Sequence, residues 1–98
     1  MSKGRDNAMG MYIEKLKEIL SLHFKFTRKR YRLTQNSMSE ILHIAPRSYI
    51  ELEHVKSLCC TCVFFFYLQF LGKEKALLLV SEILDAFMGL DKEDNEIA

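Results

Sequence analysis

Five cationic side chains stand within eight residues, and no carboxylate interrupts them. They are Lys25, Arg28, Lys29, Arg30 and Arg32. Guanidinium and ammonium groups gathered in this way can neutralise the phosphates of a nucleic acid, which releases condensed counterions. The same run also suits a solvated helix end, where cations interact favourably with the negative pole of the helix dipole. Both interpretations are open from the sequence.

Formal charge is unevenly distributed along a chain whose net charge is +1. Residues 1–56 carry eleven Lys or Arg and six Asp or Glu, a net charge of +5, whereas residues 57–98 carry three and seven, a net charge of −4. A basic segment favours an anionic partner. The amino-terminal part is therefore the candidate face for a nucleic acid.

The chain lacks the motifs of common catalytic and cofactor sites. It has no Gly-rich phosphate loop, no nucleophile elbow and no His-rich metal motif. Cys59, Cys60 and Cys62 are too crowded for spaced pairs of zinc ligands, and no secretory signal precedes them, so we expect reduced, buried thiols. We expect no enzyme activity, no cofactor, no metal and no small-molecule inducer.

The elements that position the cations are predicted to be helices of one small domain. Ninety-eight residues, about half of them apolar, are enough for one modest core. Helical periodicity is much commoner than alternation, and only one Pro and four Gly interrupt the chain, so an all-α fold is predicted. The first helix is expected from Met11 to about Tyr31, and its turns before Leu20 could pack on another chain or on the last helix.

Two short amphipathic helices joined by a tight turn are predicted within residues 33–53. Thr34 suits the N-cap of the first helix, and Pro46 suits the first turn of the second. An Arg near the start of so short a helix, here Arg47, can enter a DNA major groove. The residues expected to face inward are Met38, Ile41, Leu42, Tyr49 and Leu52.

Two apolar helices are predicted to follow. Residues 58–71 are apolar on almost every side, so this helix must be covered on most of its circumference, yet it is short for a membrane span. The helix from Lys73 to Met88, with Gly89 suited to its end, carries a stripe that can pack on its neighbour and on a second subunit. The stripe consists of Leu77, Val80, Leu84 and Phe87.

Residues 24–71 resemble the Cro/CI-type (phage repressor-like, Xre) helix-turn-helix DNA-binding family. The matching residues are Leu33, Thr34, Gln35, Ser39, Ile44, Leu52 and Glu53. The resemblance implies a five-helix lambda-repressor-like fold and an internal ion pair between Arg28 and Glu53. Two positions depart from the pattern, because His43 and Val55 stand where the family has Gly. His tolerates a left-handed backbone and Val does not, so we expect a different path after Glu53.

The resemblance also assigns contacts with DNA. Arg47 would donate to a guanine, and Glu51 either accepts from a cytosine amino group or stays solvated, since phosphates repel it. The residues placed at base edges are Pro46, Arg47, Ser48, Ile50 and Glu51. The resemblance places Thr34, Gln35, Lys56 and Ser57 at phosphates, and the basic run itself adds Lys29, Arg30 and Arg32.

One recognition helix reads few base pairs, so a homodimer on a palindromic operator is expected. The chain then divides into a flexible tail (1–9), a helix-turn-helix domain (10–71), a dimerisation helix (72–90) and an acidic tail (91–98). These features predict a cytoplasmic, sequence-specific transcriptional regulator of prokaryotic or phage type with no membrane contact. The alternative is a protein-interaction module on a helix-turn-helix scaffold that no longer reads DNA, which the small net charge and the two departures favour.

Overall fold

The computed structural model describes the backbone of residues 2–97 and the side chains of residues 9–92. The described backbone is helical without a strand, which confirms the all-α prediction. Every helix within these residues is too short or too polar to span a lipid bilayer. The helices are α1 (Ser2–Arg30), α2 (Gln35–Leu42), α3 (Pro46–Glu53), α4 (Thr61–Leu71) and α5 (Lys73–Ile97).

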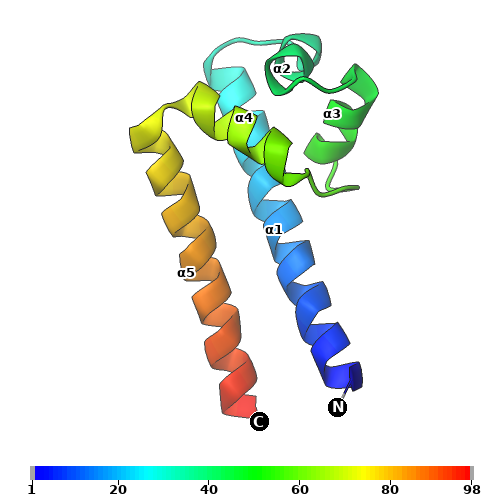
Figure 1. Ribbon diagram of the computed structural model, residues 1–98, viewed down its shortest axis with the longest axis vertical. Coiled ribbons are helices and arrows are strands. Elements are labelled where there is room, and N and C mark those ends of the chain that lie inside the picture. The colour runs from blue at the N-terminus through cyan, green and yellow to red at the C-terminus, as the bar shows by residue number, and fades with distance from the viewer. Residues whose placement is uncertain (1, 98) are drawn as a thin grey trace.

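The helices form a long arm with a head at one end (Figure 1). In the arm, α1 and α5 run antiparallel beside each other, and α1 begins where α5 ends. In the head, α3 packs against α1 and α2, while α4 packs against both α2 and α5. The molecule measures 45 × 28 × 20 Å along its principal axes. One face of the head and the sides of the arm are therefore open to other molecules.

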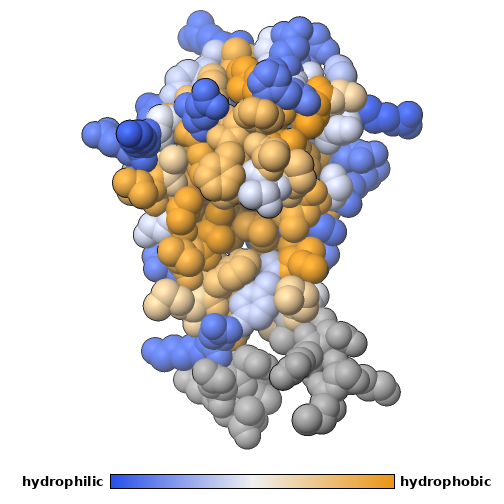
Figure 2. Space-filling view, viewed as in Figure 1, coloured by the Kyte–Doolittle hydropathy of each residue, from blue (hydrophilic) through white to orange (hydrophobic). Residues whose placement is uncertain are grey.

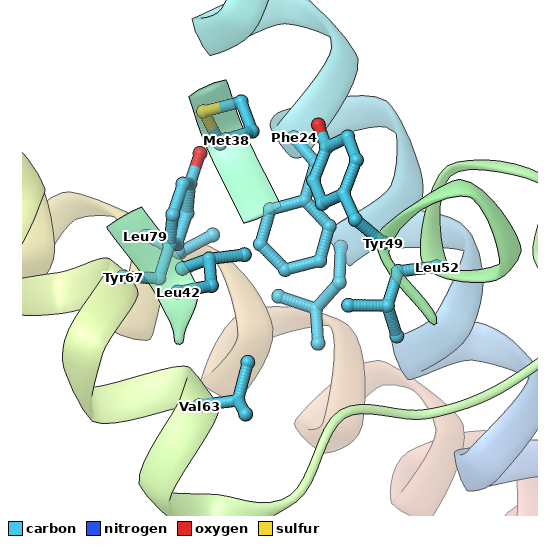
Figure 3. Close-up of a cluster of buried hydrophobic side chains, with 9 residues drawn as sticks. Phe24, Met38, Leu42, Tyr49, Leu52, Val63, Tyr67 and Leu79 are labelled. Atoms are coloured by element: carbon cyan, nitrogen blue, oxygen red, sulfur yellow. The ribbon is translucent and has the colours of Figure 1, made fainter. Parts of the chain in front are cut away.

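The core lies where the head meets the arm, and every helix contributes to it (Figure 3). Phe24 of α1 is central, because its ring packs against Tyr49 of α3 and edge-on against Tyr67 of α4. Burying a large apolar side chain contributes about 1.5–3 kcal/mol. The buried apolar residues are Leu20, Phe24, Met38, Leu42, Tyr49, Leu52, Val63, Tyr67 and Leu79.

Both long helices extend further than the sequence predicted. Regular helix begins at Ser2, in place of the flexible tail expected over 1–9, and α5 continues through Gly89 to Ile97, in place of the tail expected over 91–98. Met1 and Ala98 lie outside the described residues. Pairing of the two helices favours the continuation of α5 past Gly89, since the Tyr12 ring packs on Phe87 and the Tyr12 hydroxyl donates to Asp91.

The cysteine segment also departs from expectation. Cys60 and Cys62 are exposed and only Cys59 is half-buried, so the prediction of three buried thiols is wrong. Residues 58–60 have no regular structure, so α4 begins at Thr61 and Cys60 is its N-cap. Burial raises the pKa of the Cys59 thiol to about 11, so it is protonated at neutral pH. The described part of the chain holds no group of three His, Cys, Asp or Glu residues suited to a metal.

The apolar stripe predicted on α5 is divided between two environments. Val80 and Phe87 are half-buried, whereas Leu77 and Leu84 are 70% and 55% exposed. Leu79 is instead the residue of α5 that enters the core, with 1% of its surface exposed. The outer part of the stripe therefore lacks a partner within the described chain.

Candidate functional site

The turn between α2 and α3 fixes the direction of α3. His43 adopts a left-handed conformation with φ 60°, as its side chain permits. The backbone N–H of His43 then donates to Glu40 O at 3.2 Å, and that of Ile44 donates to Ser39 O at 3.0 Å. The His43 ring also packs on Phe66 of α4, with the ring centroids 4.4 Å apart. The turn is thus closed by backbone bonds and held against the head.

Both short helices begin at the predicted residues. Thr34 is the N-cap of α2, and its Oγ1 accepts from the backbone N–H of Ser37 at 3.0 Å. Pro46 opens α3, where its missing N–H has no intrahelical partner to lose. The N-cap of α3 is Ala45, which makes no side-chain cap bond. No side chain of the N-cap residue therefore occupies the backbone N–H groups at the start of α3.

α3 has one face in the core and one face in solvent. Tyr49, Leu52 and Glu53 are 0%, 6% and 2% exposed. On the other side, Ile50 is half-buried and the remaining residues are exposed. Those exposed residues are Pro46, Arg47, Ser48, Glu51 and, at the C-cap, His54. The five residues predicted at base edges thus lie on one short helix, and His54 extends their face.

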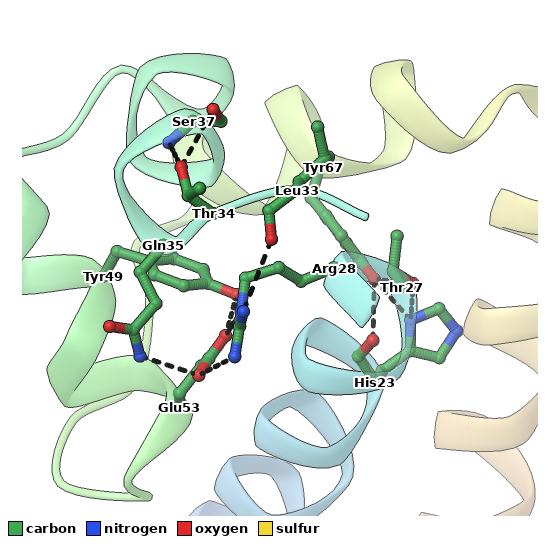
Figure 4. A network of polar contacts seen from close by, with 10 residues as sticks. All are labelled: His23, Thr27, Arg28, Leu33, Thr34, Gln35, Ser37, Tyr49, Glu53 and Tyr67. Carbon is green, nitrogen blue, oxygen red and sulfur yellow. Dashed lines mark hydrogen bonds and ion pairs between the residues drawn. The ribbon is translucent and has the colours of Figure 1, made fainter. Parts of the chain in front are cut away.

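A buried carboxylate holds α3 to α1 and α2 (Figure 4). Glu53 Oε2 accepts from Arg28 Nε at 2.6 Å and from the Tyr49 hydroxyl, and Glu53 Oε1 accepts from Arg28 Nη2 at 3.3 Å and Gln35 Nε2 at 3.1 Å. Burial raises the pKa of Glu53, but these donors outweigh burial and hold the pKa below the ordinary 4.5. The ion pair implied by the family resemblance is present. It locks α3 in one orientation.

Two of the predicted phosphate contacts are occupied within the protein. The Gln35 amide donates to Glu53, and the Thr34 hydroxyl donates to Ser37 Oγ at 3.0 Å while it caps α2. Both side chains therefore serve the fold, and their predicted contacts with phosphates stay predictions. The remaining predicted cations are exposed, and Ser57 is half-buried. These cations are Lys29, Arg30, Arg32 and Lys56.

The chain after α3 makes a left-handed turn at Val55, although Val disfavours that conformation. Val55 has φ 59°, so the expected change of path is wrong. The backbone N–H of Lys56 donates to Glu51 O at 3.0 Å and closes the helix end. A left-handed conformation costs an L-residue about 1–2 kcal/mol, and a β-branched side chain suits it poorly. The turn therefore stores strain at the edge of the exposed face.

A second polar cluster joins α1 to α4 (Figure 4). The Tyr67 hydroxyl donates to Thr27 Oγ1 at 2.7 Å and lies 2.5 Å from His23 Nδ1. Burial lowers the pKa of His23, and nearby Glu82 offsets part of that effect. Sequence reasoning missed this cluster, although His23 and Thr27 stand four residues apart on one helix face, which is the spacing of cooperating side chains.

Comparisons with models of protein families, with curated proteins and with solved structures find no match to this chain. Function is therefore inferred from the exposed face of α3, the basic end of α1 and the uncovered apolar surface.

Proposed function

We propose that this protein is a sequence-specific regulator of transcription that binds double-stranded DNA as a homodimer. In this proposal α2 and α3 form a helix-turn-helix of the Cro/CI type, and the protein acts in the cytoplasm of a prokaryote or serves a phage. The exposed face of α3 carries the proposal. It gathers polar side chains on a helix whose opposite face is fixed by the Glu53 network.

The size and chemistry of α3 suit a major groove. A helix with its side chains is about 10–12 Å in diameter, close to the width of that groove, and the eight residues of α3 provide about two turns to lie in it. Arg47, in the first turn, can donate to O6 and N7 of a guanine, and Glu51, one turn later, can accept from a cytosine amino group. Pro46 and the exposed part of Ile50 can contact a thymine methyl group, with Ser48 beside them. Together these side chains supply direct base recognition.

In this proposal, exposed cations at the end of α1 and after α3 supply contacts that are independent of sequence. Lys29 and Arg30 are exposed in the last turn of α1, Arg32 follows in the loop, and Lys56 comes after α3. Each phosphate that they neutralise releases counterions, so affinity should fall as salt rises. These contacts would position α3 without choosing a sequence.

The uncovered surface of α5 supports a twofold dimer. Figure 2 shows apolar side chains over much of the face formed by α4 and by the arm below it. On this side a cavity of about 280 Å³ lies between α1, α4 and α5 and is lined by Phe64, Ile83 and Phe87 among others. A large exposed apolar patch marks an interaction surface. A dimer through Leu77, Val80, Leu84 and Phe87 would cover it and pair two α3 helices on a palindromic operator.

The same apolar surface favours a second candidate, a protein-interaction module that does not read DNA. Phe65 and Met88 are 60% and 66% exposed, and the net charge is only +1. A module of this kind would use the uncovered face for a different protein. It would not need the exposed cations at the end of α1 and after α3.

Filter binding with a random pool of double-stranded DNA separates the two candidates. The regulator is expected to bind the pool at low salt and to lose affinity as salt rises. Lys29→Gln and Arg30→Gln should each reduce the slope of that loss by roughly one. Lys92→Gln, at an exposed lysine near the far end of the arm, is the matched control and should leave the slope unchanged. Absence of binding at low salt would reject the regulator in favour of the module.

A further inference from the structure

One row of exposed side chains on α1 belongs neither to the core nor to the proposed DNA-reading face of α3. Its members stand four residues apart and therefore form a ridge on the helix surface. Leu22 and Phe26 occupy its centre, and each is 63% exposed. Exposed charges flank them, with Glu18 toward the amino terminus and Arg30 toward the carboxyl terminus. We call this row the α1 ridge, and it consists of Glu18, Leu22, Phe26 and Arg30.

A groove runs beside the α1 ridge, between it and α5. Its first part is a hollow of about 340 Å³ whose lining includes Glu18, Leu22 and, from α5, Glu82. Its second part is a hollow of about 200 Å³ whose lining includes Arg30 and, from α5, Leu78. Phe26 lines both hollows, so they follow one another along the helix. A ridge next to a groove is the surface with which helices pack.

The two ends of this groove carry opposite charge. Two carboxylates, Glu18 and Glu82, line the first hollow together with one cation, Lys15. Two cations, Arg30 and Lys75, line the second hollow, which has no carboxylate in its lining. The surface thus passes from an acidic end through an apolar centre to a basic end. Such a surface is complementary to itself when it is turned through 180°.

We propose that a second copy of this chain binds along the α1 ridge, with the two α1 helices antiparallel about a twofold axis. Position 24 is the midpoint, because Glu18 and Arg30 each stand six residues, or about 9 Å, from it. The twofold rotation brings Glu18 of one copy opposite Arg30 of the other and Leu22 opposite Phe26. Ridges of this i, i+4 type interdigitate in the commonest class of helix packing.

This contact differs from the α5 dimer in position and in chemistry. The α1 ridge faces a groove lined by His23 and Leu78, whereas the stripe on α5 adjoins the cavity lined by Phe64 and Phe87. Charge pairs at its ends make the ridge contact sensitive to salt, because exposed ion pairs are screened. The α5 dimer, held by apolar side chains, should persist at high salt. The ridge contact forms without DNA and shares one residue, Arg30, with the proposed phosphate contacts.

Sedimentation equilibrium at low and high salt tests the ridge contact through a charge exchange. Glu18→Arg should weaken the low-salt association step at least about tenfold, because each Arg30 then faces a like charge. The double variant Glu18→Arg with Arg30→Glu should regain the parent's association to within about threefold, because it restores both pairs. Glu40→Arg, the same change at an exposed carboxylate on α2, is the matched control.

The outcomes separate this contact from the α5 dimer. With both surfaces active, the parent forms species larger than a dimer at low salt, and Glu18→Arg reduces them to the dimer. Without the α5 dimer, the parent is a dimer at low salt and Glu18→Arg is a monomer, so the ridge contact is still observed. Equal association of Glu18→Arg and Glu40→Arg would overturn the proposal. So would a double variant that stays as weakly associated as Glu18→Arg.

Discussion

The head of this protein is packed and hydrogen-bonded within one chain, whereas the arm leaves apolar side chains exposed. In the head, the buried Glu53 carboxylate has donors from α1, α2 and α3, and Met38, Leu42 and Tyr49 have no exposed surface. In the arm, Leu77 and Leu84 are mostly in solvent. The head is therefore specified within one molecule. The arm retains surface that a second molecule would cover.

This difference separates two kinds of mutation. A change in the head should lower the stability of each chain, since it disturbs bonds that the chain makes with itself. A change on the outside of the arm should leave each chain folded and alter its assembly. Unfolding and association measured on the same variants therefore distinguish the two regions.

The largest effect is expected from Leu84→Asp on the arm. A carboxylate in the centre of the apolar stripe should weaken the α5 dimer and lower affinity for a specific DNA site by roughly a hundredfold or more. The unfolding midpoint of the dilute protein should stay near that of the parent, because Leu84 is 55% exposed. Sedimentation, urea unfolding and DNA binding at moderate salt measure the three quantities.

Leu78→Asp is the control for that experiment, because Leu78 is an exposed leucine of α5 outside the stripe. Leu78 borders the groove beside the α1 ridge, so the comparison is made at high salt, where the ridge contact is screened and Leu78→Asp should dimerise like the parent. If both aspartate variants dimerise as well as the parent, the stripe is not the dimer surface.

The next effect is expected from Glu53→Gln in the head. The change leaves the Arg28 cation beside a neutral amide in a mostly buried site, a loss that can reach about 3 kcal/mol of unfolding free energy. Urea unfolding at neutral pH measures it. Glu51→Gln, at an exposed carboxylate of the same helix, should change stability little. A Glu53→Gln protein as stable as the parent would mean that the network contributes nothing to the head.

Val55→Gly should stabilise the head by up to about 1 kcal/mol. The left-handed backbone at φ 59° strains Val, and Gly adopts it freely at some cost in unfolded-chain entropy. His43→Gly is the comparison, because His tolerates φ 60° better than Val and has less strain to lose. Thermal melts of the two variants should therefore rank Val55→Gly above His43→Gly. The reverse order would contradict the assignment of strain to Val55.

The smallest effect is expected on the melting temperature from protonation of His23, at the junction of the head and the arm. Burial lowers the pKa of His23 below 6.5, so the unfolded chain takes up a proton more readily than the folded chain. The stability linked to His23 is complete above about pH 6.5 and declines as pH falls toward the folded-state pKa. His23→Asn should reduce the difference between melting temperatures at about pH 5.5 and about pH 7.5. If the melting temperatures of His23→Asn differ between the two pH values as much as those of the parent, other groups cause the pH dependence.

The sequence predicted the head well because its signals are local. Thr34 before a helix, Pro46 at a first helical turn and the spacing of Tyr49 and Leu52 each depend on a few neighbouring residues. The family resemblance added the Arg28–Glu53 pair, which no local pattern reveals.

The arm was predicted less well because its features depend on contacts between distant segments. The continuation of α5 past Gly89 is supported by Tyr12, which contacts Phe87 and Asp91, and nothing near those residues in the sequence shows that α5 returns along α1. Gly89 suggested a helix end, yet the pairing carries α5 through it. At Val55 the local preference of the residue predicted the wrong path, because two backbone bonds hold a conformation that Val disfavours.

The most direct test of the proposed DNA reading compares Arg47→Ala with the parent on two kinds of DNA. The parent should first select a preferred sequence with two half-sites from a random double-stranded pool. Arg47→Ala should then lose about 1–3 kcal/mol on the selected site and relax the preference at one base pair per half-site, with a smaller loss on random DNA. Lys29→Gln should weaken both kinds of DNA equally. Failure of the parent to select any sequence, or an equal loss of Arg47→Ala on both DNAs, would contradict recognition of bases by α3.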